Sequence, residues 1–564
     1  MNAHPRPYYY LENFNVALDW LRGRYDELLA ADERQFMADF ARLPLQAAAL
    51  VVRMIMRQGD LFRTSKLNYT EIGPPEEAAT PLMELGWVDP RPAVGFGDLC
   101  RLLRKSELGE ILGLEGAARA VRKTELIDLA GELAEVQRPL DEWWPRAPDA
   151  IYQVRIAPLC DRLRLMFFGN FRQTWSEFVL ADLGIFRYEK VSLEPMARAF
   201  QTRAQIERFH AIYHCRELLS TDTALEEVLA AVPAPLADSD TDRDDSSPAW
   251  IEAKRAKLLF HIGQLYEKEQ ELPRALEVYA LSKHPEARMR TIRVLEKLQH
   301  IAAAAELLAQ VQQAPANELE IQLAARIQPR LNRKLDATTP RPSGDTLHVR
   351  PSRTWADMTL DLPYPDPPMR VELAVGRHLS TPEAPVIYVE NTLLNTLFGL
   401  LCWDAIFAPL PGAFFHAFHT GPADLLESDF QRRRAALFSA RLAELDTDAY
   451  RQTILARFEE KAGIQSPFVA WGALTREELE LALHCIPAAH LRKCFERLLT
   501  DLRANRSGLP DLIQLWREEH RYRLIEVKGP GDRLQDNQVR WLNFCHAHQI
   551  PVCVCKVTWQ GTPS

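Results

Sequence analysis

Three side chains near the C-terminal end have the types and the spacing of a small acidic catalytic site: Asp511, Glu526 and Lys528. The segments around them, 508–516 and 522–529, alternate as β-strands do, so residues two apart share one face of each strand. If the chain reverses midway between the segments, Asp511 lies opposite Glu526, with Lys528 on the same face. This register is an assumption, because the intervening residues lack the chemistry of a tight hairpin turn and a longer loop would shift the pairing.

Two opposed carboxylates would destabilise such a hairpin, since directly opposed strand residues hold their Cβ atoms about 4.5–5.5 Å apart. A divalent cation would neutralise them, and oxygen ligands favour Mg²⁺ or Mn²⁺ over zinc or copper. Lys528 would stand beside the ion, where an ammonium group can orient an attacking water or offset charge on a phosphorane-like transition state. The pattern therefore predicts hydrolysis at phosphorus that depends on Mg²⁺ or Mn²⁺.

The residues that follow predict the elements that complete this site. A turn at 529–531, Asp532 as a helix cap and Gln535 at a capping-box position indicate a helix that runs to about residue 548. An apolar strand at 550–555 then gives a β-β-α-β order. This arrangement resembles the restriction-endonuclease-like PD-(D/E)xK nucleases, spelled here Pro510-Asp511 and Glu526-Val527-Lys528.

A further carboxylate, Glu390, precedes this motif by more than a hundred residues. The segment 389–401 reads as a helix on which Glu390 shares a face with Leu394, Leu397 and Leu401. An acid on an apolar face either satisfies free amides at a helix N-terminus or is held by an ion. From spacing alone, the capping role is favoured.

Composition and breaks in the pattern predict several domains in a chain of 564 residues. Residues 233–248 are rich in aspartate and proline, and prolines recur through 336–366, so neither segment should form a long helix. The block before the first break has helical periodicity. The block between the breaks resembles tetratricopeptide repeats at 258–279 and, less regularly, at 287–308, and a structural spacer is favoured over a peptide-binding groove.

The chain carries a formal net charge of −9, so any surface for a polyanion must be local. Residues 98–134 read as helix, loop, helix and resemble a SAP module, which grips duplex DNA, and a second basic cluster spans 42–66. An ordinary helical hairpin, or arginines scattered over different faces, would explain the same residues. The candidate phosphate contacts are Arg57, Arg63, Lys66, Arg119, Arg122 and Lys123.

The remaining patterns of cysteines, histidines and short motifs do not point to a further catalytic or metal site. The nine cysteines form no Cys-x-x-Cys pair, which favours a reducing cytosol, and no apolar stretch is long and uninterrupted enough to predict a signal or a membrane span. Cys553 and Cys555 fit a buried strand, and His416 and His419 fit a packed loop or helix better than a metal site. Hydrolase elbows and Walker loops do not occur.

Taken together, the chain resembles the Fanconi-associated nucleases in their compact bacterial form. The resemblance rests on Phe167-Phe-Gly-Asn170 with the motif at 177–184, the SAP-like hairpin, the repeat-like helices, Val389-Glu390 with 397–400, and the VRR-NUC signature from 508 to Gln538. It implies a structure-selective DNA nuclease that cuts 5′ flaps and degrades strands from the 5′ side in interstrand-crosslink repair.

The resemblance also implies roles for individual residues. Mg²⁺ or Mn²⁺ would be held by Glu390, Asp511, Glu526 and the backbone carbonyl of Val527, with Lys528 beside them. For Glu390, the resemblance thus favours metal binding over the helix-capping role that spacing alone favours. The expected partner is branched or flapped double-stranded DNA with a 5′ end. The protein is expected to be a monomer and to bind no membrane. The sequence has no Cys/His array for the ubiquitin-binding zinc finger of eukaryotic members. The expected location is the cytoplasm at the bacterial nucleoid, or the nucleus in a eukaryote.

The predicted fold is multidomain, with mainly α N-terminal and middle regions and a C-terminal α/β nuclease domain of the PD-(D/E)xK type. Its expected parts are an N-terminal helical DNA-binding region (1–97), a SAP-like module (98–135), a helical region (136–232), an acidic linker (233–248), TPR-like helices (249–335), a proline-rich connection (336–370) and the VRR-NUC domain (371–564). Two other functions remain open: a DNA-junction-binding scaffold, and a Holliday-junction resolvase, which normally needs a dimer.

Overall fold

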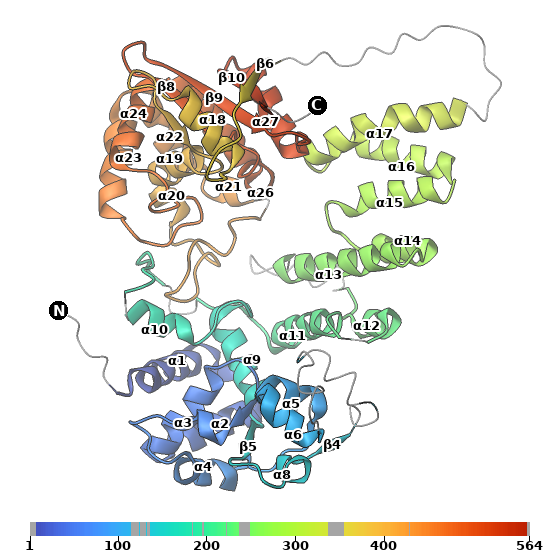
Figure 1. Ribbon diagram of the computed structural model, residues 1–564, viewed down its shortest axis with the longest axis vertical. Coiled ribbons are helices and arrows are strands. Elements are labelled where there is room, and N and C mark those ends of the chain that lie inside the picture. Colours follow the sequence, from blue (N-terminus) through green and yellow to red (C-terminus); the bar gives the residue numbers. More distant parts are fainter. Residues whose placement is uncertain are drawn as a thin grey trace. The chain divides into compact units, whose positions relative to one another are not determined.

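The computed structural model describes residues 7–113, 123, 131, 136–182, 184–193, 197–221, 223–235, 249–336, 355–427 and 429–560. The chain divides into two compact units (Figure 1). The first unit comprises residues 1–186 with 193–206, and the second comprises 187–192 with 207–564. The linker residues 236–248 and most of the proline-rich connection, 337–354, lie outside the described residues.

The first unit begins with helices, as predicted, but it also contains a small sheet. Its elements up to residue 89 are α1 (Tyr9–Tyr25), α2 (Ala31–Phe40), α3 (Leu45–Ile55), β1 (Leu61–Arg63), α4 (Pro75–Glu84) and β2 (Val88–Asp89). The antiparallel strand β5 (Ile151–Val154) pairs with both β1 and β2. The sheet therefore draws one strand from beyond the predicted boundary at residue 97, because pairing across the chain is invisible to local periodicity.

The SAP-like segment starts as two short helices, α5 (Phe96–Leu102) and α6 (Lys105–Ile111). Leu103 and Arg104 between them adopt extended backbone angles, so the first expected helix is broken in two. Phe96, Leu99 and Leu108 share a core with Trp143 of α8 (Leu140–Trp143). The short strands β3 (Val94–Gly95) and β4 (Gln137–Arg138) bracket this segment. The expected second helix, at 124–127, lies outside the described residues.

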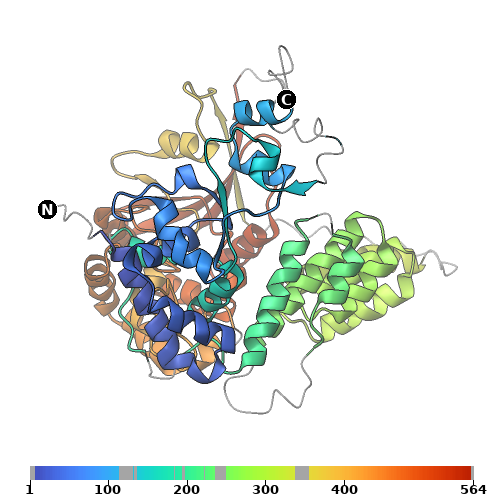
Figure 2. The ribbon, with the colours of Figure 1, turned by 90° about the horizontal axis from the view of Figure 1, so that it is seen from below.

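The helices α9 (Ala157–Phe168) and α10 (Ser176–Asp182) complete the first unit, and α11 (Arg203–Leu218) spans the division between the units. The second unit continues with an array of helices in which each packs on its neighbours (Figure 2). They are α12 (Leu225–Ala231), α13 (Ala249–Lys268), α14 (Leu272–Leu281), α15 (Ala287–Lys297), α16 (Ile301–Gln313) and α17 (Glu318–Asp336).

The helix pairs α13 with α14 and α15 with α16 confirm the expected repeat-like hairpins. A small residue is needed where the first pair meets. A Cβ atom at Gly263 would lie 2.6 Å from the ring of Tyr279, closer than two carbon atoms can approach.

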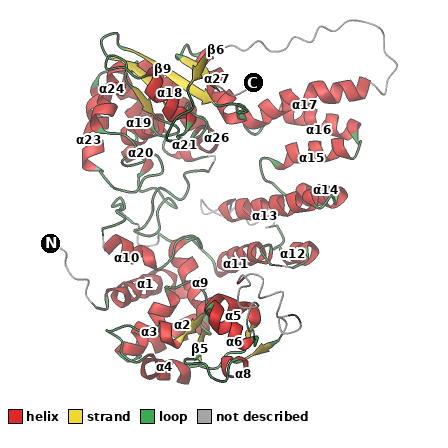
Figure 3. Ribbon diagram, viewed as in Figure 1, coloured by secondary structure: helices red, strands yellow, loops and turns green. Residues whose placement is uncertain are grey.

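The nuclease sheet has five strands in the order β6-β10-β9-β8-β7, and Figure 3 shows them as the main sheet of the second unit. They are β6 (Ala356–Leu362), β7 (Val386–Tyr388), β8 (Leu512–Trp516), β9 (Arg521–Lys528) and β10 (Val552–Trp559). The helix α27 (Asp536–Ala547) joins β9 to the parallel strand β10, which confirms the expected β-β-α-β order.

Two expectations about this sheet need correction. The edge strand β6 pairs in parallel with β10, although it lies in the stretch expected to be only a connection, so the sheet begins well before residue 371. The second correction concerns the cap of α27, which is Gln535 and not Asp532. Oε1 of Gln538 accepts from the backbone N–H of Gln535 at 2.8 Å and so forms the capping box. Asp532 instead closes the preceding turn by accepting from the backbone N–H of Gly529 at 3.0 Å.

Further helices complete the domain. They are α18 (Val371–Leu379), α19 (Leu393–Leu401), α20 (Trp403–Ile406), α21 (Phe430–Arg433), α22 (Ala435–Ala443), α23 (Ala449–Glu460), α24 (Arg476–Cys485), α25 (Ala488–Thr500) and α26 (Leu502–Asn505). Among them, α18 packs on β7, β8 and β9, and α24 packs on β8. Every residue of α19 is buried. Even so, no helix in the described ranges is both long and apolar enough to cross a membrane.

Candidate active site

The hairpin of β8 and β9 has the register that the sequence predicted. Ile513 pairs with Leu524 and Trp516 with Arg521, across a turn at residues 517–520. Asp511 directly precedes β8, and its Oδ2 accepts a hydrogen bond from the backbone N–H of Val527 at 2.8 Å. The two acidic positions are therefore brought together at one end of the hairpin.

Glu526 is completely buried in β9, with an exposed fraction of 0%. Its Oε1 lies 2.7 Å from Nζ of Lys528, the residue two positions along the same face. Its Oε2 has no hydrogen-bond partner among the residues that the structure describes. A buried carboxylate oxygen without a partner is costly, so this atom is a free ligand for a cation.

Both carboxylates have raised pKa values. Burial is the main cause for Glu526, and repulsion by Asp511 adds to it, which raises the pKa of Glu526 to about 8 despite the attraction of Lys528. Burial also raises the pKa of Asp511 to about 6, although the Val527 N–H and Lys528 oppose the shift. Near neutral pH, burial therefore disfavours a negative charge on both carboxylates at once, and Lys528 offsets only one of the two charges.

Glu390 lies at the same end of the sheet, but it is not on a helix as expected. It occupies the turn between β7 and α19, which starts only at Leu393, and its side chain is exposed. The hydroxyl of Tyr388 donates to Glu390 Oε2. Burial and this neighbouring carboxylate together raise the pKa of Tyr388 to about 12. Repulsion from Glu390 also raises the pKa of both Asp511 and Glu526, so the three acids share one electrostatic environment.

The donor set fits a hard divalent cation, because it consists of carboxylate oxygens with one buried oxygen unused. In the described parts of the chain, no three His, Cys, Asp or Glu side chains are gathered closely enough to hold an ion as they stand. Glu526 instead contacts Lys528, and Glu390 accepts from the hydroxyl of Tyr388.

Three residues around the acids escaped the sequence analysis. Tyr388 ends β7 two positions before Glu390, which lies in the turn that follows, so strand periodicity alone does not pair the two residues. Asn391 is one of the few residues other than glycine with a left-handed backbone, at φ 51°. Glu372, in the first turn of α18, adds to the repulsion that raises the pKa of Asp511, and no local pattern points to it.

The candidate phosphate contacts separate into three groups. Arg63 is buried, with Nη1 2.8 Å from Glu107 and Nη2 2.8 Å from Asp149, so its prediction as a DNA contact is wrong. Arg57 and Lys66 are exposed, and Arg57 donates to the backbone carbonyl of Lys66 at 3.1 Å.

In the SAP-like segment, Nζ of Lys123 donates to the carbonyl of Leu103 at 2.7 Å. Arg119 and Arg122 lie outside the described residues.

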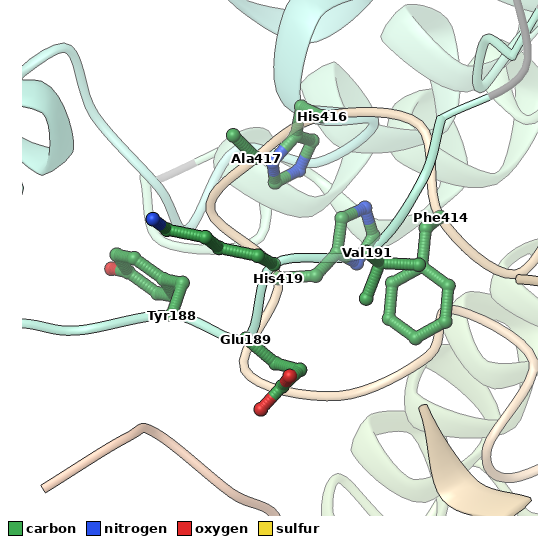
Figure 4. Close-up of a pocket in the computed structure, with 8 residues that line it drawn as sticks. Tyr188, Glu189, Val191, Phe414, His416, Ala417 and His419 are labelled. Carbon is green, nitrogen blue, oxygen red and sulfur yellow. The ribbon is translucent and has the colours of Figure 1, made fainter. Parts of the chain in front are cut away.

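The histidine pair lines a cavity of about 200 Å³, shown in Figure 4. The rings of His416 and His419 stack with their centroids 4.0 Å apart. The backbone N–H of Phe415 donates to Nε2 of His419 at 3.4 Å, and Nδ1 of His419 lies 3.2 Å from the carbonyl oxygen of Gly421. Burial lowers the pKa of His419 to about 4, which keeps it neutral. These contacts agree with the expected packed loop, and Cys553 and Cys555 are likewise buried.

Comparison with protein families divides the chain into three matched regions. Residues 446–559 match the VRR-NUC domain, residues 8–89 match the FAN1 HTH domain, and residues 97–143 match the Fanconi anemia-associated nuclease SAP domain. The VRR-NUC match contains Asp511, Glu526 and Lys528, whereas Glu390 precedes it. Two stretches of the first unit, residues 8–89 and the SAP-like segment at 97–143, thus match recognised domains.

Similarity to whole proteins extends over the entire chain. The Fanconi-associated nuclease 1 homolog of Pseudomonas aeruginosa is 47% identical over 99% of this chain and 97% of that protein. Human Fanconi-associated nuclease 1 is 32% identical over 34% of this chain and 20% of that protein. A crystal structure of paFAN1 bound to a 5′-flap DNA with a gap and a 2-nucleotide flap superposes with a TM-score of 0.91, at 47% identity, and covers 100% of both chains.

Proposed function

Because the chain belongs to the Fanconi-associated nuclease family, we propose that it is a divalent-metal-dependent DNA phosphodiesterase that cuts 5′ flaps and degrades strands in the 5′-to-3′ direction, in the repair of interstrand crosslinks. The observation that carries the proposal is the buried pair of Asp511 and Glu526, with an unpartnered Glu526 oxygen and Lys528 at 2.7 Å. The binding of 5′-flap DNA by the similar paFAN1 supports this choice of substrate.

In the proposed mechanism, the metal would be held by Glu390, Asp511, Glu526 and the backbone carbonyl of Val527. When bound, Mg²⁺ or Mn²⁺ lowers the pKa of a water molecule and stabilises charge on the phosphate. Asp511 is kept in place by the Val527 N–H and by its own carbonyl, which accepts from Val389 at 2.8 Å. Lys528, whose ammonium group lies 2.7 Å from Glu526 Oε1, would orient the attacking water or the scissile phosphate.

The N-terminal domains would hold the duplex arms of the substrate. Arg57 and Lys66 are exposed in the region matched to the HTH domain, and Arg119, Arg122 and Lys123 belong to the region matched to the SAP domain. On a chain with a net charge of −9, such local positive groups are needed to attract phosphates. We propose that the protein acts on DNA as a monomer.

A scaffold that only recognises DNA would not need this carboxylate arrangement. Keeping Glu526 buried without a full set of partners costs folding free energy, and a binding protein gains nothing from that cost. A Holliday-junction resolvase would use similar chemistry but needs two active sites to cut opposite strands. Light scattering of the protein with a junction and with a flap separates a dimer from the proposed monomer.

Cleavage of defined substrates tests the function. End-labelled 5′ flaps, 3′ flaps, nicks and four-way junctions are incubated with Mn²⁺ and with EDTA, using wild type, Asp511→Ala and Glu519→Gln. Glu519 is a matched acidic control, since it is exposed in the turn of the same hairpin and pairs with Arg521 at 2.8 Å. We expect cutting of 5′ flaps by wild type and the control only. Undiminished cutting by Asp511→Ala, or in EDTA, would refute the proposed site.

A further inference from the structure

The turn that carries Glu390 is fastened to the segment that carries Asp511 by one amide side chain. Asn391 Oδ1 accepts from the backbone N–H of Leu509 at 3.2 Å, two residues before Asp511. Asn391 Nδ2 lies 3.4 Å from Glu390 Oε1, on the other side of the amide. The side chain therefore touches both acidic segments, although 118 residues separate Asn391 from Leu509 in the chain.

The two contacts use both ends of the amide and fix its orientation. The N–H of Leu509 needs an acceptor and the carboxylate of Glu390 needs a donor, and the asparagine side chain supplies both, through Oδ1 and Nδ2. An aspartate would place a second negative oxygen against Glu390. The backbone adds a further constraint, since Asn391 has φ 51°, a region in which asparagine is tolerated better than most residues.

The neighbouring bonds make this turn rigid. Buried Asn395 donates through Nδ2 to the carbonyl of Asn391 at 2.8 Å and to that of Arg506 at 2.9 Å, so a second amide joins the same two segments. On the other flank, Val389 donates to the carbonyl of Asp511 at 2.8 Å. The Tyr388 hydroxyl then holds the exposed carboxylate of Glu390 itself through Oε2.

We propose that Asn391 and Tyr388 are positioning residues for the metal site: Asn391 fixes the Glu390 turn against the Asp511 segment, and Tyr388 aims the Glu390 carboxylate. This inference rests on the proposed function, in which Glu390 is a metal ligand. Glu390 is the exposed member of the acidic set, whereas Asp511 is buried directly before β8 and Glu526 is buried within β9. It therefore depends most on neighbouring side chains for its direction.

The test measures Mn²⁺ binding without DNA, from the rise in unfolding temperature of the full chain as Mn²⁺ is added. The variants are Asn391→Gly, Asn391→Ala, Tyr388→Phe and Glu390→Gln. Glycine keeps the left-handed backbone free of strain but removes both side-chain bonds, so it separates bonding from backbone conformation and folds even if the alanine variant does not. Gln549→Ala is the matched control, since Gln549 has φ 56° and follows α27 in the same domain.

We expect Asn391→Gly and Tyr388→Phe to raise the half-saturating Mn²⁺ concentration about tenfold or more, as outer residues of metal sites do, with Gln549→Ala unchanged. A normal Mn²⁺ requirement in Asn391→Gly and Tyr388→Phe, with a raised one in Glu390→Gln, would overturn the positioning role alone. An unchanged requirement in Glu390→Gln would overturn the metal role of Glu390, and this inference with it.

Discussion

Replacing Glu526 with glutamine should make the metal-free protein more stable while it removes activity. The carboxyl group is completely buried, and its pKa is raised from an ordinary value of 4.5 to about 8. A pKa that is higher in the folded protein than in the unfolded chain means that folding stability is complete below about pH 4.5 and is lost as the pH rises through about 8. Glutamine has no proton to lose, so the variant escapes this loss.

The size of the effect follows from the shift. Ionising Glu526 in the folded protein costs about 1.4 kcal/mol per pKa unit, which gives an upper bound of about 5 kcal/mol above pH 8. Against this, the buried NH₂ group of the glutamine would face the position where Glu526 Oε2 has no partner among the described residues, at a cost of about 1–3 kcal/mol. A net gain of at most about 2–4 kcal/mol remains, or about 4–16 °C in the unfolding temperature of a domain of this size.

The assay is thermal unfolding in EDTA from pH 5 to 8.5, repeated with Mn²⁺. Wild type should lose stability relative to Glu526→Gln as the pH rises, and Mn²⁺ should restore wild type but not the variant. Glu519→Gln, in the exposed turn of the same hairpin, should follow wild type throughout. If Glu526→Gln is the less stable protein in EDTA at every pH, or responds to Mn²⁺ as wild type does, the reasoning about a buried charge that awaits a cation is refuted.

Four further predictions concern the metal, the lysine and the two ends of the chain. Ca²⁺ should permit DNA binding with little cleavage, because it coordinates at about 2.3–2.6 Å against 2.0–2.1 Å for Mg²⁺; equal cleavage rates in the two ions would contradict this. Lys528→Ala should lower the cleavage rate strongly with flap affinity nearly kept, and unchanged turnover on labelled flaps would remove the lysine from the mechanism. Replacing Arg57 and Lys66 with alanine should flatten the slope of log affinity against log salt by about 0.9 for each lost phosphate contact. In contrast, Arg63→Ala should lower the unfolding free energy by about 3–5 kcal/mol, because it leaves Glu107 and Asp149 without their buried counter-charge. Loss of DNA binding without destabilisation in Arg63→Ala would instead make Arg63 a DNA contact. A fragment from residue 371 should be less stable than one from residue 350, because only the longer fragment keeps β6 paired with β10, and equal urea midpoints would show that this pairing contributes little.

The hairpin at the centre of the site could be predicted because its information is local. The alternation of residues predicts which side chains share a face, so Asp511, Glu526 and Lys528 could be predicted to lie together once a point of chain reversal was assumed, and the structure has that register. Helical periodicity likewise indicated the repeat-like helices, and the requirement for a small residue at Gly263 follows from their close packing.

Contacts between distant segments could not be predicted in this way. Arg63 lies in a basic cluster of the kind that binds phosphates, but folding places its guanidinium group between Glu107 and Asp149, two acids far away in the sequence. The strand β6 lies in a proline-rich stretch and gains its structure from pairing with β10, nearly 200 residues later. Local propensity is weak in such a segment, so the partner decides its conformation.

The sequence by itself determined the chemistry of this protein, and the tertiary structure decided how that chemistry is controlled. Residue types and a two-residue period were sufficient to identify two carboxylates and a lysine that suit a divalent cation. Only the fold shows that Glu526 is fully buried, that Glu390 sits in a turn instead of on a helix, and that Asn391 ties this turn to Leu509. The physical reason is that burial and hydrogen bonding depend on which segments meet in space, whereas side-chain chemistry and strand periodicity are properties of the segment alone.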